Sequence, residues 1–197
     1  MKKITAMIIS APSGGGKGTV VDYLLKEFPH LFTRSVSYCT RDISNQETQG
    51  IHYVQVSRKK FEKLILAGEL VEYEEIYGDY YGTPKSEFDR AKQEGKILLL
   101  DIDVNGAVRL KRILGDDVLF FFIHSGNDIF IYQDRILKRG RSNDTLEKIK
   151  KRIERIPIEL NAGELDSDFM IPNIEDETFL LKGTRKILHF LEIIKKE

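Results

Sequence analysis

The sequence has little or none of three features that would assign it to a specialised class. Cys39 is the single cysteine among 197 residues, so no disulfide can form within the chain, and we expect a reducing, cytoplasmic environment. The 31 lysines and arginines balance the 31 aspartates and glutamates, so no overall positive charge attracts nucleic acid. No apolar run is long enough to span a bilayer and no signal peptide is recognisable, so we expect no membrane partner.

What the sequence does contain indicates an α/β protein. Hydrophobic residues make up 41% and charged residues 31% of the chain, which suits one folded core with an insertion or two. Short apolar runs alternate with segments of helical periodicity, and this alternation predicts a parallel sheet flanked by helices. The expected strands are residues 4–9, 97–102, 118–123 and 169–171. The expected helices are residues 18–28, 85–94, 106–114, 128–137, 144–159 and 177–195.

Two insertions interrupt this pattern. Residues 33–83 contain short β-rich pieces with turn signals, and residues 126–161 are helical and rich in lysine and arginine. We therefore predict a core of residues 1–32, 84–125 and 162–197 that carries a small β-rich subdomain and a helical lid. The β-rich pieces are residues 35–38, 52–56, 70–76 and 79–81, with a short helix at 58–67.

A glycine-rich segment links the first expected strand to the first expected helix. Its glycines allow backbone N–H groups to face one concavity, and Lys17 adds a positive charge at the helix N-terminus. The segment is close to the phosphate-binding pattern G-x-x-x-x-G-K-[ST], although Ala11 and Gly18 stand where a glycine and a hydroxyl residue are expected. It predicts a P-loop NTPase-type fold and a nucleoside triphosphate site. The site comprises Ala11, Pro12, Ser13, Gly14, Gly15, Gly16, Lys17, Gly18 and Thr19.

Five further motifs follow along the chain. They are SVSYCTR at 35–41, GIHY at 50–53, EY at 72–73, YYGT at 80–83 and LDIDVNG at 100–106. Together with the glycine-rich segment they resemble the guanylate kinase family in order and spacing over nearly the whole chain. The resemblance implies ATP-dependent phosphorylation of GMP, and of dGMP, to GDP in purine nucleotide metabolism, with Mg²⁺ as cofactor. It also implies that the β-rich insertion binds GMP and that the lid is mobile, and it leaves open whether the protein is a monomer or a homo-oligomer.

Glu72 is the candidate for selecting guanine. A carboxylate offers two acceptors to the N1–H and N2–H donors of guanine, whereas the N1 acceptor of adenine would be repelled. Taken without its neighbouring motifs, Glu72 would be interpreted as an exposed strand residue. The resemblance implies that Ser37, Thr83 and Asp103 make the remaining contacts to the base.

Arg41 is the candidate for binding the phosphate of GMP, because its planar guanidinium suits phosphate oxygens. The resemblance adds the hydroxyls of Tyr53 and Tyr81. The family usually has a second arginine where this chain has Ser44, and losing such a contact costs about 1.5–3 kcal/mol. We therefore expect a high KM for GMP unless Arg34 or a lid arginine compensates.

The resemblance also assigns residues to the phosphoryl-transfer centre. Arg135 and Arg139, four residues apart on one helix, and Arg152 resemble the lid arginines that close over the transferring group and are expected to be catalytic with Lys17 and Arg41. The spacing between Arg139 and Arg152 is longer than in the family, so Arg141 competes with Arg139 for this role. Asn173 occupies the position of an asparagine near the adenine.

Asp101 ends an apolar strand, where a carboxylate has no packing role, so it is the candidate for orienting Mg²⁺. An alternative is that Asp101 caps the following helix. Because Gly18 carries no hydroxyl, we expect Mg²⁺ to be held mainly through water, ATP phosphates and Asp101, with Thr19 as a further candidate ligand.

Two other functions remain open at this point. Ser44 stands where the family usually has an arginine, and this difference is compatible with a P-loop kinase that acts on another phosphorylated acceptor. Guanylate-kinase-like domains of scaffolding proteins bind phosphorylated peptides without catalysis, although such modules generally lose the phosphate-binding loop that this chain keeps. The four histidines are scattered without metal-ligand spacing and are expected to be ordinary surface or core residues.

Overall fold

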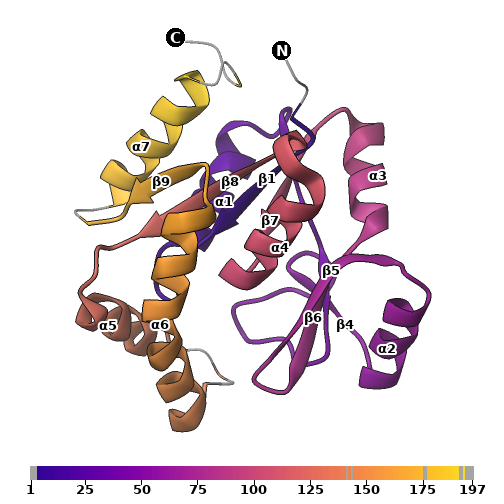
Figure 1. Ribbon diagram of the computed structural model, residues 1–197, viewed down its shortest axis with the longest axis horizontal. Helices are drawn as coiled ribbons and strands as arrows, with labels where there is room; N and C mark the ends of the chain where they lie inside the picture. Colours follow the sequence, from indigo (N-terminus) through magenta and orange to yellow (C-terminus); the bar gives the residue numbers. More distant parts are fainter. Residues whose placement is uncertain (1–3, 141, 143, 175–176, 191–192, 194–197) are drawn as a thin grey trace.

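The computed structural model describes residues 4–140, 142, 144–174, 177–190 and 193. A five-stranded sheet forms the centre of the molecule, with the strand order β2-β7-β1-β8-β9 and parallel pairing throughout (Figure 1). The predicted α/β class with a parallel sheet is confirmed. The strands are β1 (Ala6–Ser10), β2 (Phe32–Arg34), β7 (Ile97–Asp101), β8 (Val118–His124) and β9 (Phe169–Pro172).

Both faces of this sheet are buried under helices, which explains why its strands are apolar without alternation. Met7 and Ile9 of β1 face a cluster completed by α1 (Lys17–Glu27) and α7 (Glu177–Phe190). Ala6 and Ile8 face the opposite cluster. The helices on that side are α3 (Lys85–Glu94), α4 (Val104–Leu114) and α6 (Leu146–Asp166).

The two insertions project from the same side of the core (Figure 1). The first forms a four-stranded sheet in the order β4-β3-β6-β5, backed by helix α2 (Arg58–Leu66), whose Phe61 and Leu64 are buried. Its strands are β3 (Ser37–Cys39), β4 (Tyr53–Gln55), β5 (Leu70–Ile76) and β6 (Asp79–Pro84). The second insertion contains α5 (Ile129–Arg139) and the first turns of α6.

Several expected boundaries were wrong. Strand β2 was not expected, because a three-residue edge strand with one buried residue, Phe32, carries no recognisable alternation. The adjoining piece expected at 35–38 begins two residues later, as β3. Helix α4 begins at Val104 rather than 106, because Asp103 caps it. The expected end of the last helix falls on residues outside the described part of the chain, beyond the end of α7 at Phe190.

Helix α6 is longer than expected. It ends at Asp166 instead of 159 and contains Pro157. Its C-terminal part packs against β8, where a Cβ on Gly163 would lie 2.3 Å from the ring of Phe122. This close approach stabilises a segment whose own sequence favours a helix weakly. The expected lid boundary at residue 161 falls inside this helix.

Among the described residues, no helix combines the length and the apolar character that crossing a membrane requires. Burial raises the pKa of the Cys39 thiol to about 11, so this cysteine stays protonated near neutral pH.

Candidate active site

A cavity of about 550 Å³ lies where the carboxyl edge of the parallel sheet meets both insertions. The neighbouring strands β1 and β7 bring the glycine-rich loop and Asp101 to this edge, where ligands bind in open α/β sheets. The small sheet contributes Ser37, Tyr53 and Tyr81 to the cavity, and α5 and α6 contribute arginines. The fold therefore gathers at one place most of the residues that the motifs singled out.

The glycine-rich loop is tightly packed before it enters α1. Gly14 and Gly16 have φ angles of 85° and 101°, which glycine adopts without strain. A Cβ on Gly16 would lie 2.5 Å from Asn173 Nδ2, and one on Gly15 would lie 2.7 Å from Ala11 Cβ. The loop therefore requires glycine for its path, and it presents the N-terminus of α1 to the cavity, a favourable position for an anion.

Lys17 and Asp101 form an ion pair inside the cavity. Lys17 Nζ lies 2.8 Å from Asp101 Oδ1 and also donates to the carbonyl of Ile102 at 3.2 Å. The side chain that caps α4 is Asp103, whose Oδ1 accepts from Asn105 N at 2.9 Å. The alternative that Asp101 caps this helix is therefore wrong.

The donor atoms beside the loop suit a magnesium ion. The Asp101 carboxylate and the Thr19 hydroxyl are hard oxygen donors that line the same cavity. Gly18 is exposed, and no atom lies within 4 Å of the place a Cβ would take there. In the described part of the chain no three His, Cys, Asp or Glu residues group as an all-protein metal site.

Glu72 is buried, with 6% of its surface exposed, so the interpretation as an exposed strand residue is wrong. Its Oε1 accepts a hydrogen bond from Thr83 Oγ1 at 2.7 Å. Burial raises the pKa of Glu72 to about 7, opposed by this hydrogen bond and reinforced by the charge of Asp103. A guanine base would supply the two donors that stabilise the ionised carboxylate.

Gly106 allows two carboxylates to approach the start of α4. A Cβ at this position would lie 3.2 Å from Glu72 Oε2 and 3.3 Å from Asp103 Oδ2. Thr83 is paired with Glu72 across the neighbouring strands β6 and β5, and β3, which carries Ser37, is the next strand of the same sheet. Asp103 and Ser37 line the cavity, whereas Glu72 and Thr83 are not among the described residues that line it.

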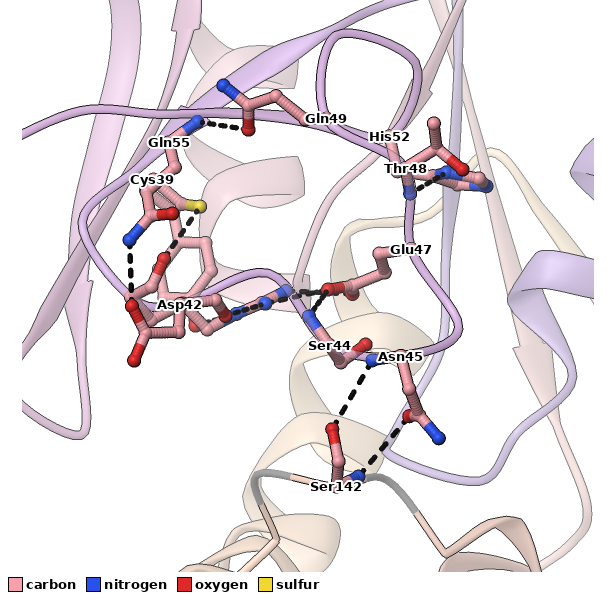
Figure 2. Close-up of polar contacts among 12 residues, drawn as sticks. Cys39, Asp42, Ser44, Asn45, Glu47, Thr48, Gln49, His52, Gln55 and Ser142 are labelled. Atoms are coloured by element: carbon pink, nitrogen blue, oxygen red, sulfur yellow. Dashed lines mark hydrogen bonds and ion pairs between the residues drawn. The ribbon is translucent and has the colours of Figure 1, made fainter.

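Arg41 follows β3 and contacts both tyrosines that were expected to bind phosphate with it. Its Nε donates to Tyr81 Oη at 3.0 Å, and its guanidinium carbon lies 4.9 Å from the centre of the Tyr53 ring. The guanidinium also pairs with Glu47. Ser44 is buried, and its backbone N–H donates to Glu47 Oε2 at 3.0 Å (Figure 2). Arg34 lines the cavity and pairs with Asp22.

The arginines expected in the lid line the cavity, and two of them, Arg139 and Arg152, pair with one acidic residue. Arg152 Nη1 lies 2.7 Å from Asp144 Oδ1, and Arg139 Nη2 lies 4.0 Å from Asp144 Oδ2. The Asp144 side chain is 4% exposed, so the charges are held close together inside the lid. Arg141 lies outside the described residues.

Asn173 supports the glycine-rich loop. Its side-chain Nδ2 donates to the backbone carbonyl of Gly15 at 2.9 Å. The backbone carbonyl of Asn173 accepts a hydrogen bond from Arg135 Nη2 at 3.1 Å. Arg135 Nη1 also donates to Ser125 Oγ at 2.6 Å. Asn173 is not among the described residues that line the cavity, so the expected contact with adenine stays a prediction.

Sequence analysis missed acidic residues at this site, among them Glu47, Asp144 and Glu159. Glu159 Oε1 lies 3.4 Å from Arg155 Nε, and burial raises the pKa of Glu159 to about 7. The four-residue spacing of this pair on α6 was a usable signal. Glu47 and Asp144 lie outside helices and strands, where no periodicity indicates which side chains point inward.

The chain is similar to known guanylate kinases over most of its length. A sequence model described as "Guanylate kinase" matches residues 3–182. The guanylate kinase of Salinibacter ruber is 35% identical over 188 residues, covering 94% of this chain and 96% of that protein. The guanylate kinase of Porphyromonas gingivalis is 40% identical over 160 residues, covering 81% and 84%.

Solved structures show the same fold. The guanylate kinase of Anaplasma phagocytophilum superposes with a TM-score of 0.74 at 24% identity, covering 99% of this chain and 89% of that one. A shikimate kinase from Acinetobacter baumannii, in complex with shikimate, has a TM-score of 0.50 at 12% identity and coverages of 100% and 97%. With a family match over most of its length and relatives of this similarity, the chain belongs to the guanylate kinase family.

Proposed function

We propose that this protein transfers a phosphoryl group from ATP to GMP and so forms GDP. The observation that carries the proposal is the buried carboxylate of Glu72, which accepts a hydrogen bond from Thr83 and lies beside a cavity that also contains Lys17, Asp103 and the glycine-rich loop. Two carboxylate oxygens match the N1–H and N2–H groups of guanine. Adenine cannot supply these two donors to the buried carboxylate, and its N1 acceptor would be repelled, which is a strong basis for discrimination.

The donor and the acceptor bind at opposite ends of the cavity in this proposal. The loop amides and Lys17 hold the terminal phosphates of ATP, while Arg41, Tyr53 and Tyr81 hold the phosphate of GMP. Asn173 keeps the loop in place through its bond to the Gly15 carbonyl.

The lid supplies positive charge to the transferring group. Phosphoryl transfer depends on alignment and on charge neutralisation more than on covalent chemistry. Arg135, Arg139 and Arg152 line the cavity, and we assign this task to them. Contact with the transferring oxygens requires Arg139 and Arg152 to exchange Asp144 for phosphate.

Magnesium is the metal that we propose to accompany ATP, with Asp101 and Thr19 as the protein residues nearest to it. When bound, the ion would neutralise part of the negative charge on the ATP phosphates. Asp101 also holds Lys17 in position through the 2.8 Å ion pair, so this carboxylate organises the donor end in two ways.

A coupled assay for ADP release tests the proposal with GMP, dGMP, AMP and dTMP as acceptors. We expect GMP to give the highest kcat/KM, with dGMP also accepted because the contacts proposed here address the base and the phosphate. A higher kcat/KM for AMP or dTMP would contradict the role of Glu72. The cytoplasmic location and the absence of a nucleic-acid partner stay predictions.

A further inference from the structure

Strand β5 carries two carboxylates on one face. Glu72 and Glu74 are two residues apart in this strand, so their side chains point to the same side of the sheet, while Glu75 points to the other side. The strand lies at the edge of the small sheet, where it pairs with β6. Its position relative to the core therefore depends on side-chain contacts with the helix beside it, α4 (Figure 1).

Glu74 binds this helix with both of its carboxylate oxygens. Asn105 Nδ2 donates to Glu74 Oε1 at 2.8 Å, and Arg109 Nη2 donates to Glu74 Oε2 at 3.2 Å. Asn105 and Arg109 are four residues apart, so they share one face of α4. Arg109 Nη1 also donates to the backbone carbonyl of Tyr73 at 2.6 Å, which ties the helix to the strand itself. The Glu74 side chain is 14% exposed, so solvent screens these bonds only partly.

The same turn of α4 receives Glu72. A Cβ on Gly106, the residue after Asn105, would lie 3.2 Å from Glu72 Oε2. The other oxygen of Glu72 accepts from Thr83, which belongs to the same small sheet and so cannot fix the position of that sheet on the core. The bonds between Glu74 and α4 can fix it, because a slide of β5 along the helix would break them and would displace Glu72 by the same step.

The proposed guanine site draws on both sides of this contact. Glu72 belongs to the small sheet, whereas Asp103 caps α4 and belongs to the core, yet both are assigned to the same base. Hydrogen bonds weaken steeply when the donor and the acceptor leave their preferred distance and angle. Recognition of guanine therefore requires the two carboxylates to keep a fixed position relative to each other.

Arg109 also offsets the negative charge that gathers at this contact. Burial raises the pKa of Glu74, and the charge of Asp103 adds to this rise. The hydrogen bond from Asn105 and the charge of Arg109 oppose it. Burial likewise raises the pKa of Glu72, and the charge of Arg109 opposes that rise as well. The guanidinium that binds Glu74 thus also favours the ionised form of Glu72, which is the form that accepts both guanine donors.

We propose that Glu74 is a positioning residue for guanine specificity, holding β5 on α4 so that the Glu72 carboxylate meets the N1–H and N2–H groups of the base. This inference rests on the proposed function, because it concerns the same acceptor. Glu74 is not among the described residues that line the cavity, so its effect reaches the base through Glu72.

Glu74→Ala tests the inference, because it removes both bonds to α4. We expect kcat/KM for GMP to fall about tenfold, mainly through a higher KM for GMP, while the KM for ATP stays the same. Inosine monophosphate (IMP) lacks the N2 amine, so it gains less from an aligned second oxygen, and the ratio of kcat/KM for GMP to that for IMP should fall about three- to tenfold. Glu74→Gln keeps an oxygen for Asn105 but loses the ion pair, so its values should lie between those of Glu74→Ala and the wild type.

Two further variants accompany this test. Arg109→Ala should lower the GMP-to-IMP ratio in the same direction, and adding it to Glu74→Ala should have little further effect, because both residues act through one contact. Glu75→Gln is the matched control: Glu75 is the next residue of the strand, pairs with Arg58 at 3.2 Å and is 44% exposed, and its loss should change none of these values.

A purely structural contact predicts a different result. Lower stability of Glu74→Ala in urea with an unchanged GMP-to-IMP ratio would overturn the inference. If the alanine variant fails to fold, the ratio measured for Glu74→Gln decides in the same way.

Isothermal titration calorimetry with GMP and IMP separates this inference from the proposed function. A wild type that binds GMP more tightly than IMP but forms no GDP would refute the phosphoryl transfer, and the ratio of the two Kd values in the variants would then decide on Glu74. GDP formation by the wild type with an unchanged ratio in the variants would refute the role of Glu74 alone. A wild type without preference for GMP over IMP would refute both.

Discussion

Replacing Glu72 by glutamine should weaken guanine recognition and at the same time stabilise the fold. Glutamine keeps an oxygen for Thr83 Oγ1, which donates to Glu72 Oε1 at 2.7 Å. It replaces the other acceptor with an NH₂ donor, which then faces one of the two guanine donors. We expect this mismatch to cost about 2–4 kcal/mol, so that kcat/KM for GMP falls about 30- to 1000-fold.

The stability effect has the opposite sign because Glu72 is buried. Its pKa is raised from 4.5 to about 7 in the folded protein, so the folded state binds the proton more tightly than the unfolded chain. The ionised carboxylate therefore lowers the free energy of unfolding above about pH 7, by at most about 3 kcal/mol, and this penalty disappears below about pH 4.5. Glu72→Gln should be more stable than the wild type at about pH 8, with a gain that shrinks as the pH falls.

Urea unfolding at about pH 8 and about pH 5, together with acceptor kinetics, measures both effects. AMP should gain relative to GMP in the variant, because the amide N–H can donate to N1 of adenine. Glu75→Gln serves as the control for removing a carboxylate at an exposed position of the same strand. A variant that is less stable than the wild type at about pH 8, or that keeps its kcat/KM for GMP, would refute this account of the guanine site.

Three further substitutions test the donor end and the start of α4. Lys17→Ala should lower kcat about 100- to 1000-fold with the fold intact by circular dichroism, whereas a phosphopeptide-binding module would keep its peptide affinity. A Cβ at Gly18 would have no atom within 4 Å, so Gly18→Ser should fold normally. Its hydroxyl should lower the Mg²⁺ concentration needed for half-maximal activity, and an unchanged Mg²⁺ titration would count against a metal beside this residue. Gly106→Ala places a Cβ 3.2 Å from Glu72 Oε2, so the KM for GMP should rise about tenfold while the KM for ATP stays the same. Equal changes in both KM values would indicate a general distortion of the protein instead.

Local sequence was sufficient for much of the fold and for the identity of most candidate residues. The apolar runs predicted four of the five parallel strands, because strands buried on both faces are hydrophobic throughout. The glycine-rich loop could be located because left-handed φ angles at Gly14 and Gly16 require glycine, a constraint that is visible in the residue type. Glu72 and Arg41 were identified through motifs whose order along the chain matches a family.

Tertiary structure alone decided how charges from separate segments pair. Sequence spacing could not indicate that Glu47 returns to Arg41 or that Asp144 binds Arg152, since both acidic residues lie in irregular segments. The length of α6 was decided in the same way, by the contact of Gly163 with Phe122 on another element. Secondary structure follows from periodic local preferences, whereas ion pairs and burial depend on which distant segments the fold brings together.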